Sequence, residues 1–231
     1  VIILIDSYEI FFEKAKLSKK QFFEFGIEET IFANLRKAED EWKELSERIR
    51  EKSTDDFYIR GYGRNSVNTT MYEELYKKVF GIIVKPDTTG NSQPKKIIEK
   101  MTLKSTQSKK QHEKIVNYQV SHVFGKTKNI FMFTAPWNVA FVPKIMDPFT
   151  GHEAQGSMVK EFTAIFQNKA YEKFGHLIEE YNQIILDKNH EKRIGEYLDS
   201  LSCKTKNTEN ERKVGRFIKS VLSELRPVNL R

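Results

Sequence analysis

The stretch of this chain that most limits its fold is residues 118–153, which read YQVSHVFGKTKNIFMFTAPWNVAFVPKIMDPFTGHE. One apolar run ends at His122, and a second run, Val139–Val142, begins after Asn138 and stops at Pro143. Short apolar runs bounded by turn residues are typical of buried strands. Amphipathic, charged sequence lies on both sides. We therefore expect an α+β fold that is mostly helical, with one small hairpin at its centre.

The flanking sequence predicts helices more clearly than strands. Apolar residues spaced by three and four positions predict one long helix over residues 27–52 and a final helix over residues 211–225. We also expect a short strand and a glycine-punctuated loop within residues 55–68, and a turn-rich connection over residues 85–94. Residues 157–174 and 177–186 are predicted as separate helices.

No internal repeat or long linker divides the chain, so we expect a single domain over residues 1–231. Within it we distinguish a helical N-terminal part (1–114), a hairpin core (115–168) and a set of C-terminal helices (169–231).

Positive charge is concentrated in residues 95–128, which hold nine lysines but only two acidic residues, Glu99 and Glu113. The formal net charge of the chain is +7, so the remainder is close to neutral. Residues 95–114 are predicted as a short basic helix followed by a flexible lysine-bearing loop. Such a segment can be an ordinary solvated surface, but it is also typical of proteins that bind a polyanion.

Composition excludes several classes of protein. The single cysteine, Cys203, excludes an internal disulfide and a cysteine-rich zinc site. The longest apolar runs are about five residues, too short to cross a membrane. The apolar start, Val1–Ile5, is followed at once by Asp6 and has no basic region before it, so we do not expect a secretory signal. These features favour a cytoplasmic location and no membrane partner.

The central stretch contains residue types that suit phosphodiester hydrolysis. That reaction needs an activated water and positive charge on the phosphate oxygens. His122, at the end of a predicted strand, can take the proton of a water because imidazole titrates near neutral pH. Asn138, at the start of the next strand, can hold the loop so that the histidine is aimed. Lys126 and Lys128 lie in the intervening turn, where they can reach phosphate.

These residues resemble a known motif. WNVAFVPK resembles the middle of the HNH motif of ββα-metal endonucleases, SHVFG the strand that carries its general base, and TGHE the segment that carries a metal ligand. The resemblance covers about 35 of the 231 residues. It implies a ββα-metal hairpin and helix in which His122 is the general base, Asn138 holds the loop and His152 binds a divalent ion such as Mg²⁺.

The sequence departs from that motif at two positions. Ser121, a poorer metal ligand, stands where the family has Asp or His beside the base to share the metal, and Gly156 stands where many members have a second helical ligand. Asp147 or Glu153 can supply the missing ligand, because carboxylate oxygens suit Mg²⁺.

The resemblance therefore implies a Mg²⁺-dependent endonuclease that cuts double-stranded DNA, such as a restriction or phage-defence enzyme. Such enzymes commonly act as homodimers, because two sites are needed to cut both strands of a palindrome. Arg60, Arg64 and Asn65 lie in a glycine-containing loop that can contact phosphates or base edges.

Three alternatives remain open. The chain can be a non-catalytic nucleic-acid-binding protein that uses residues 95–128. His122 and His152 can be ordinary polar residues of a loop-rich core. A restriction-type site built from carboxylates and a lysine would begin at Pro86-Asp87, but no acid-x-Lys pattern follows on a plausible strand.

Overall fold

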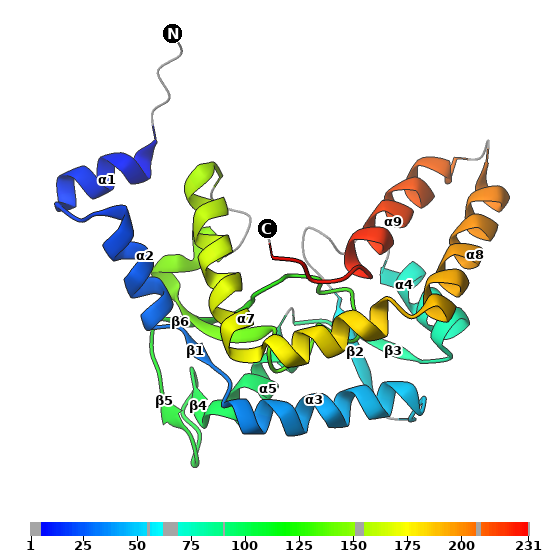
Figure 1. Cartoon of the computed structure of the whole chain (residues 1–231), viewed down its shortest axis with the longest axis horizontal. Coiled ribbons are helices and arrows are strands. Elements are labelled where there is room, and N and C mark those ends of the chain that lie inside the picture. Colours follow the sequence, from blue (N-terminus) through cyan, green and yellow to red (C-terminus); the bar gives the residue numbers. More distant parts are fainter. Residues whose placement is uncertain are drawn as a thin grey trace, which may run out of the picture.

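The fold was analysed in a computed structural model that describes residues 6–54, 56–61, 69–89, 91–150, 155–206 and 209–230. It confirms the mixed α+β class, with long helices around small sheets (Figure 1). The helices are α1 (Ser7–Ala15), α2 (Lys19–Glu28), α3 (Leu35–Arg50), α4 (Thr69–Leu75) with the π-helical turn η1 (Tyr76–Phe80), α5 (Ser92–Thr102), the 3-10 turn η2 (Lys144–Met146), α6 (Asp147–Thr150), α7 (Ser157–Ile185), α8 (Lys188–Thr205) and α9 (Glu211–Glu224).

The strands form three small sheets within the described residues. The largest has the order β1-β7-β6 and is antiparallel, with its pairing running from Tyr118↔Pro143 to His122↔Val139. The other two sheets are parallel pairs, β2 with β3 and β4 with β5. The strands are β1 (Ile31–Phe32), β2 (Phe57–Arg60), β3 (Val84–Asp87), β4 (Lys104–Ser105), β5 (Glu113–Lys114), β6 (Tyr118–His122) and β7 (Val139–Pro143).

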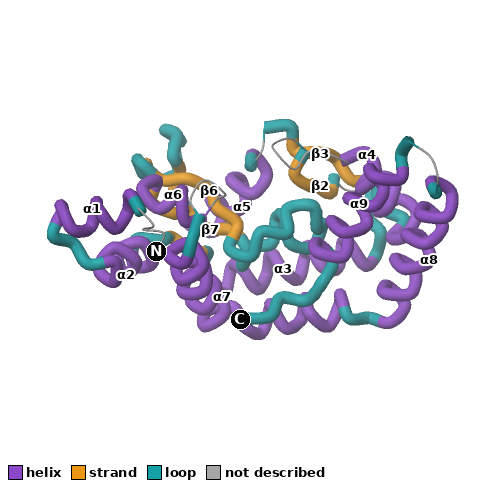
Figure 2. Tube along the Cα trace, turned by 90° about the horizontal axis from the view of Figure 1, so that it is seen from above, coloured by secondary structure: helices purple, strands orange, loops and turns teal. Residues whose placement is uncertain are grey.

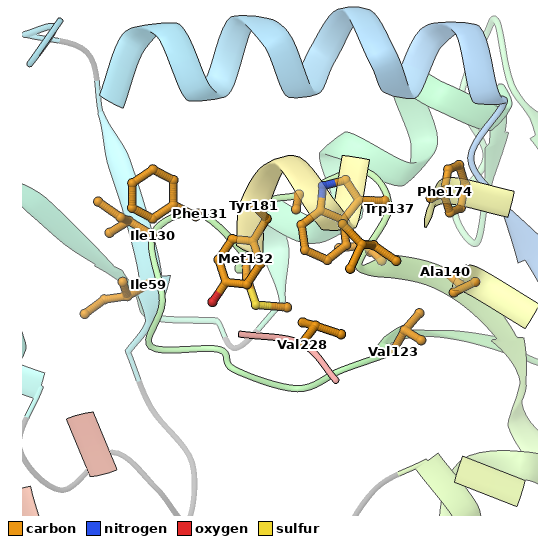
Figure 3. Close-up of a cluster of buried hydrophobic side chains, with 14 of the residues drawn as sticks. Ile59, Val123, Ile130, Phe131, Met132, Trp137, Ala140, Phe174, Tyr181 and Val228 are labelled. Carbon is orange, nitrogen blue, oxygen red and sulfur yellow. The ribbon is translucent and has the colours of Figure 1, made fainter. Parts of the chain in front are cut away.

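The core is centred on β7 and on the loop that joins β6 to β7. All five residues of β7 are buried, and Trp137 just before it lies 5.4 Å from Trp42 of α3, ring centre to ring centre. Figure 3 shows side chains of this loop, including Phe131 and Met132, in one cluster with Tyr181 of α7. The loop is therefore part of the hydrophobic core, although it has no regular secondary structure.

Both strands predicted for the hairpin are confirmed, but the long helix predicted over residues 27–52 is wrong at its start. There, α2 ends at Glu28, β1 pairs with β7, and α3 begins only after Asn34. The Asn34 side chain caps α3 by accepting a 3.3 Å hydrogen bond from the Lys37 amide. Pairing with β7 and this local cap together overrode the helical spacing of the apolar residues.

One further expectation was wrong. Residues 85–87, expected in a turn-rich connection, form β3 together with Val84, and Pro86 fits there because this two-stranded sheet consists only of edge strands. The predicted break between the helices 157–174 and 177–186 is confirmed, because α7 has non-helical backbone angles at Phe174 and is kinked there. The boundary placed between residues 168 and 169 lies within the first helical segment of α7.

The basic segment 95–114 is largely ordered by ion pairs. Lys109 and Lys95 both lie near the carboxylate of Glu99, whose side chain is almost completely buried. Lys100 pairs with Glu41 at 2.5 Å, and Lys104 pairs with Glu113. The predicted flexible loop is therefore a set of short strands and salt bridges. Across the described residues, every helix is too short or too polar to span a lipid bilayer.

Candidate functional site

His122 ends β6, which is an edge strand of the antiparallel sheet. Its ring stacks on that of Phe133, with 5.4 Å between ring centres and 14° between ring planes. The Nε2 atom lies 2.9 Å from the backbone oxygen of Phe133. A carbonyl oxygen can only accept, so Nε2 carries the hydrogen and Nδ1 is the basic nitrogen.

Burial lowers the pKa of His122 from its usual 6.5 to about 4. The Arg60 guanidinium also lowers this pKa, while the hydrogen bond to Phe133 and the Asp87 carboxylate act in the opposite direction. The side chain nevertheless remains partly exposed. His122 is therefore a neutral imidazole at pH 7, held in one orientation and able to accept a proton.

Asn138 holds the loop that His122 contacts. Its side chain is completely buried, and its Oδ1 accepts a 2.9 Å hydrogen bond from the Phe124 amide. Its Nδ2 donates to the oxygens of Gly125 (3.1 Å) and Met132 (2.9 Å). The carboxamide thus links the two ends of the loop and fixes the position of Phe133, the partner of His122.

The described residues proposed as metal ligands lie away from His122. Ser121 pairs with Ala140, whereas His122 pairs with Val139, so their side chains point to opposite faces of the sheet. Asp147 accepts a hydrogen bond from Gln119, which is on the Ser121 face. That face also carries Phe32, which packs on α7.

The remaining proposed ligands, His152 and Glu153, lie outside the described residues. Within the described part of the chain, no group of three or more His, Cys, Asp or Glu side chains could hold a metal ion. The described residues alone therefore do not supply the metal-binding half of the predicted ββα-metal motif, and the Mg²⁺ site stays a prediction.

Lys126 is tied to the end of α9. Its Nζ donates to the backbone oxygens of Ser223 and Arg226, both at 2.9 Å. Burial lowers its pKa from 10.5 to about 8. Lys126 therefore links the β6–β7 loop to the C-terminal tail, and its donors are already used by protein carbonyl groups.

Lys128 is used in the same way, at a position that is 3% exposed. Its Nζ donates to the backbone oxygen of Arg60 and, at 2.8 Å, to the Thr69 hydroxyl. Burial lowers its pKa to about 8. The structure does not support the prediction that Lys126 and Lys128 reach phosphate, because both ammonium groups donate to protein oxygens.

A second group of polar residues lies beside His122, where the parallel strands β2 and β3 end. Arg60 and Asp87 stand opposite each other in the register of these two strands. The Arg60 amide donates to the oxygen of Thr127 at 2.9 Å. Asn91, just before α5, donates to the oxygen of Val120 in β6 at 3.4 Å. The Arg60 Nε and Asn91 Oδ1 atoms are both buried without a hydrogen-bond partner among the described residues. These are polar atoms that a bound ligand can satisfy.

Asp87 is the fixed anion of this group. Burial alone would raise its pKa, but hydrogen bonds from Gln93, Ser92 and Thr89 outweigh burial and hold the pKa below its usual value. The sequence analysis did not assign Asp87 or Asn91 to the site. A usable signal was the run of Thr, Asn and Ser after Asp87, which is typical of a turn that leads into a helix. Arg64 and Asn65 lie outside the described residues.

Comparison with known proteins places the chain in a family. A family model described as "Uncharacterised protein PM1201" matches residues 33–230. The chain belongs to this family. It is similar to "Uncharacterized protein PM1201" of Pasteurella multocida (strain Pm70), with 38% identity over 180 residues, which cover 78% of this chain and 79% of that protein. No solved structure matches the chain.

The span of the family match indicates which parts of the fold are shared. It begins at Ala33, after α1, α2 and β1, and continues to Leu230 in the C-terminal tail. The hairpin with His122 and Asn138, the Arg60–Asp87 strand ends and α9 all lie inside it. The candidate site is therefore built from the part of the chain that defines the family.

Proposed function

We propose that the protein hydrolyses phosphodiester bonds in nucleic acid and that His122 is the base that activates water. The observation that carries this proposal is the state of the imidazole: neutral, partly exposed and oriented by the 2.9 Å hydrogen bond to Phe133. A general base has to be unprotonated at working pH and aimed at its water. The low pKa supports the first condition, and the hydrogen bond that fixes the ring supports the second.

Arg60 supplies the positive charge that the reaction needs. Its guanidinium is close enough to lower the pKa of His122, and its Nε has no hydrogen-bond partner in the described part of the chain. A phosphodiester bound there would satisfy this donor and bring a negative charge beside the imidazole. That charge would raise the pKa of His122 from about 4 towards neutrality, so the histidine would become a stronger base only when substrate is present.

The hydrolysis combines a proton transfer to His122 with a displacement at phosphorus. Nδ1 of His122 takes a proton from water as the water oxygen forms a bond to phosphorus. The bond from phosphorus to the leaving oxygen breaks, its electron pair stays on that oxygen, and the oxygen takes a proton from solvent. Arg60 stabilises the charge on the phosphate oxygens, and His122 returns its proton to solvent after the products leave. Asn138 acts through the loop and is a positioning residue.

Mg²⁺ is part of the proposal through the resemblance to HNH endonucleases. A bound divalent ion would stabilise charge on the phosphate and leaving oxygens. A sequence-specific restriction or phage-defence role, a preference for double-stranded DNA and a homodimer follow only from the same resemblance. Each is tested by the cleavage pattern and by the mass of the protein in solution.

The decisive test replaces His122 by Gln. The Gln side chain can still donate to the Phe133 oxygen but cannot act as a base. We expect Mg²⁺-dependent nicking of supercoiled plasmid to fall by about 100-fold or more, with DNA binding and thermal unfolding nearly unchanged. His176→Gln is the matched control, because His176 is exposed and bonded to Glu39 far from the site. Equal cleavage by His122→Gln and wild type would remove His122 from the mechanism.

A second candidate is a nucleic-acid-binding protein without catalysis. It is favoured by the stacking of His122 on Phe133 and by its low pKa, which also suit a purely structural histidine. Under this alternative the wild type binds DNA but cleaves neither DNA nor RNA with any divalent ion, and His122→Gln changes neither property.

A further inference from the structure

Helix α9 has two different faces. Val214, Phe217 and Val221 are buried, and the Phe217 ring packs edge-on against Tyr72 of α4 with 5.1 Å between ring centres. The opposite face carries Arg212, Arg216 and Lys219, spaced by four and three residues, so that they form one row. All three are exposed. We refer to this row as the basic face of α9. It spans roughly 10 Å along the helix axis.

Among the described residues, no carboxylate forms an ion pair with the basic face. None of its three side chains forms an ion pair or hydrogen bond with another described residue. The two acids of α9 lie off this face, Glu211 in the first turn and Glu224 in the last. Glu224 is bonded to the Lys128 amide. Three neighbouring positive charges without ion pairs create a local positive potential that attracts anions.

A groove lies between the first half of α7 and the C-terminal tail that follows α9. Its volume is about 680 Å³. Figure 1 shows α9 and the first half of α7 rising on the same side of the molecule with the tail between them, and Figure 2 shows the tail in the same place from above. Its polar lining consists of cations, amides and a hydroxyl, with no acidic residue among the described lining residues: Lys126, Lys160, Thr163, Gln167, Asn168, Arg226 and Asn229.

Hydrogen bonds to the β6–β7 loop fix both walls of the groove. Lys126 gives its donors to the tail and so fixes the tail against the β6–β7 loop. Gln167 donates to the oxygen of Val123 at 3.3 Å, which joins α7 to the same loop. Lys160 and Arg226 remain exposed at the groove. These two charges add to a lining of amides and a hydroxyl, and α9 leads directly into the tail that forms one wall of the groove.

We infer that the basic face of α9 and this groove bind the phosphodiester backbone of a nucleic acid. The row of cations matches a polyanion with regularly spaced charges, and the amides and hydroxyl of the groove can bond phosphate and sugar oxygens. The inference takes its ligand class from the proposed function but does not depend on His122. It assigns binding to a surface outside residues 95–128, where the sequence concentrates lysine.

The test measures binding without cleavage, in EDTA, with a fluorescent DNA oligonucleotide of about 20 nucleotides as single strand and as duplex. The variant Arg212→Gln/Arg216→Gln/Lys219→Gln removes the basic face. The matched control Lys96→Gln/Lys110→Gln/Lys114→Gln removes three exposed lysines from the basic segment and changes the net charge equally.

We expect the α9 variant to weaken binding at least about tenfold and to make the plot of log affinity against log salt less steep by about 2. The control should stay within about twofold of wild type. The inference is overturned if the α9 variant binds like wild type, or if both variants lose affinity equally, since the effect would then come from net charge alone. It is also overturned if the protein binds anionic phospholipid vesicles through α9 but does not bind either oligonucleotide.

The same assay separates this inference from the proposed function. If His122→Gln binds DNA through α9 but the wild type never cleaves it, the proposed hydrolysis fails while the binding surface stands. If the wild type cleaves DNA and the α9 variant binds and cleaves equally well, the hydrolysis stands and the α9 surface fails.

Discussion

The β6–β7 loop and helix α9 both carry basic side chains, and they use them in opposite ways. In the loop, the Lys126 ammonium donates to backbone oxygens at the end of α9, and Lys128 donates to the oxygen of Arg60. On α9, Arg212, Arg216 and Lys219 are exposed and have no partner among the described residues. The first set of charges holds the fold together, and the second is free to meet a ligand.

The difference shows that the position of a lysine in the fold decides what its charge does. The loop is drawn into the core by Phe131, Met132 and Trp137, all of which are 2% exposed or less. Its lysines are thereby carried next to carbonyl groups that lie far away in the sequence. Helix α9 buries only one face, so the cations on its other face stay in water.

The largest effect should come from releasing the loop. Asn138→Ala removes three hydrogen bonds and leaves the Phe124 amide and the oxygen of Gly125 without a partner among the described residues, while the oxygen of Met132 keeps its bond from the Ala135 amide. We expect the free energy of unfolding to fall by about 3–5 kcal/mol, measured by urea denaturation. A loss below about 1 kcal/mol would show that water replaces these bonds and that the loop is not held as described.

The next effect concerns His122 and appears only in acid. Its pKa is about 4 in the folded protein and near 6.5 when unfolded, so the unfolded chain binds the proton more readily. The stability contributed by the neutral imidazole is therefore complete above pH 6.5 and is lost as the pH falls towards 4. The loss should reach at most about 3 kcal/mol.

The measurement compares wild type with His122→Gln between pH 7 and pH 4. Buried carboxylates such as Asp87 and Glu99 also lower stability in acid, and they do so in both proteins. Only the difference between the two curves reports on His122. Curves that stay parallel throughout would mean that His122 keeps an ordinary pKa and is fully solvated.

Local signals in the sequence were enough to predict both strands of the hairpin and the last helix. Four successive apolar residues closed by Pro143 specify β7, and apolar residues spaced by three and four specify α9. These features depend on neighbours within about 20 residues, and pattern reasoning sees such neighbours.

Features that depend on distant partners could not be predicted. Strand β3 exists because it pairs with β2, about 25 residues earlier, and its Pro86 argued against a strand. The partners of Lys128 lie at Arg60 and Thr69, and no local pattern connects them. A count of lysines could not show which of them have partners. Lys95, Lys100, Lys104 and Lys109 pair with carboxylates, and Lys126 and Lys128 donate to oxygens inside the fold.

For the candidate site, too, the sequence predicted local positions but not which residues come together. His122 and Asn138 were placed correctly on the hairpin, because each stands at the end of an apolar run. The grouping of Ser121 and Asp147 with His122 was wrong in this structure, since neighbours along a strand point to opposite faces. Alternation along β6 was visible in the sequence and would have separated Ser121 from His122.

The smallest expected effects on stability come from making the same substitution, Lys to Met, in the β6–β7 loop and on α9. Lys128→Met leaves the oxygen of Arg60 without its donor and should lower the free energy of unfolding by about 1 kcal/mol. Lys219→Met changes an exposed position and should stay within about 0.5 kcal/mol of wild type. Denaturation in urea at pH 7 measures both.

Binding of the labelled oligonucleotide should show the reverse order. Lys219→Met should weaken binding by a few-fold, whereas Lys128→Met should leave it unchanged, because the Lys128 ammonium already has protein partners. If Lys128→Met weakened binding more than Lys219→Met while the protein stayed folded, the loop lysines would be ligand contacts after all. If the expected order is found instead, a charge contributes to recognition only where the fold leaves it without a protein partner.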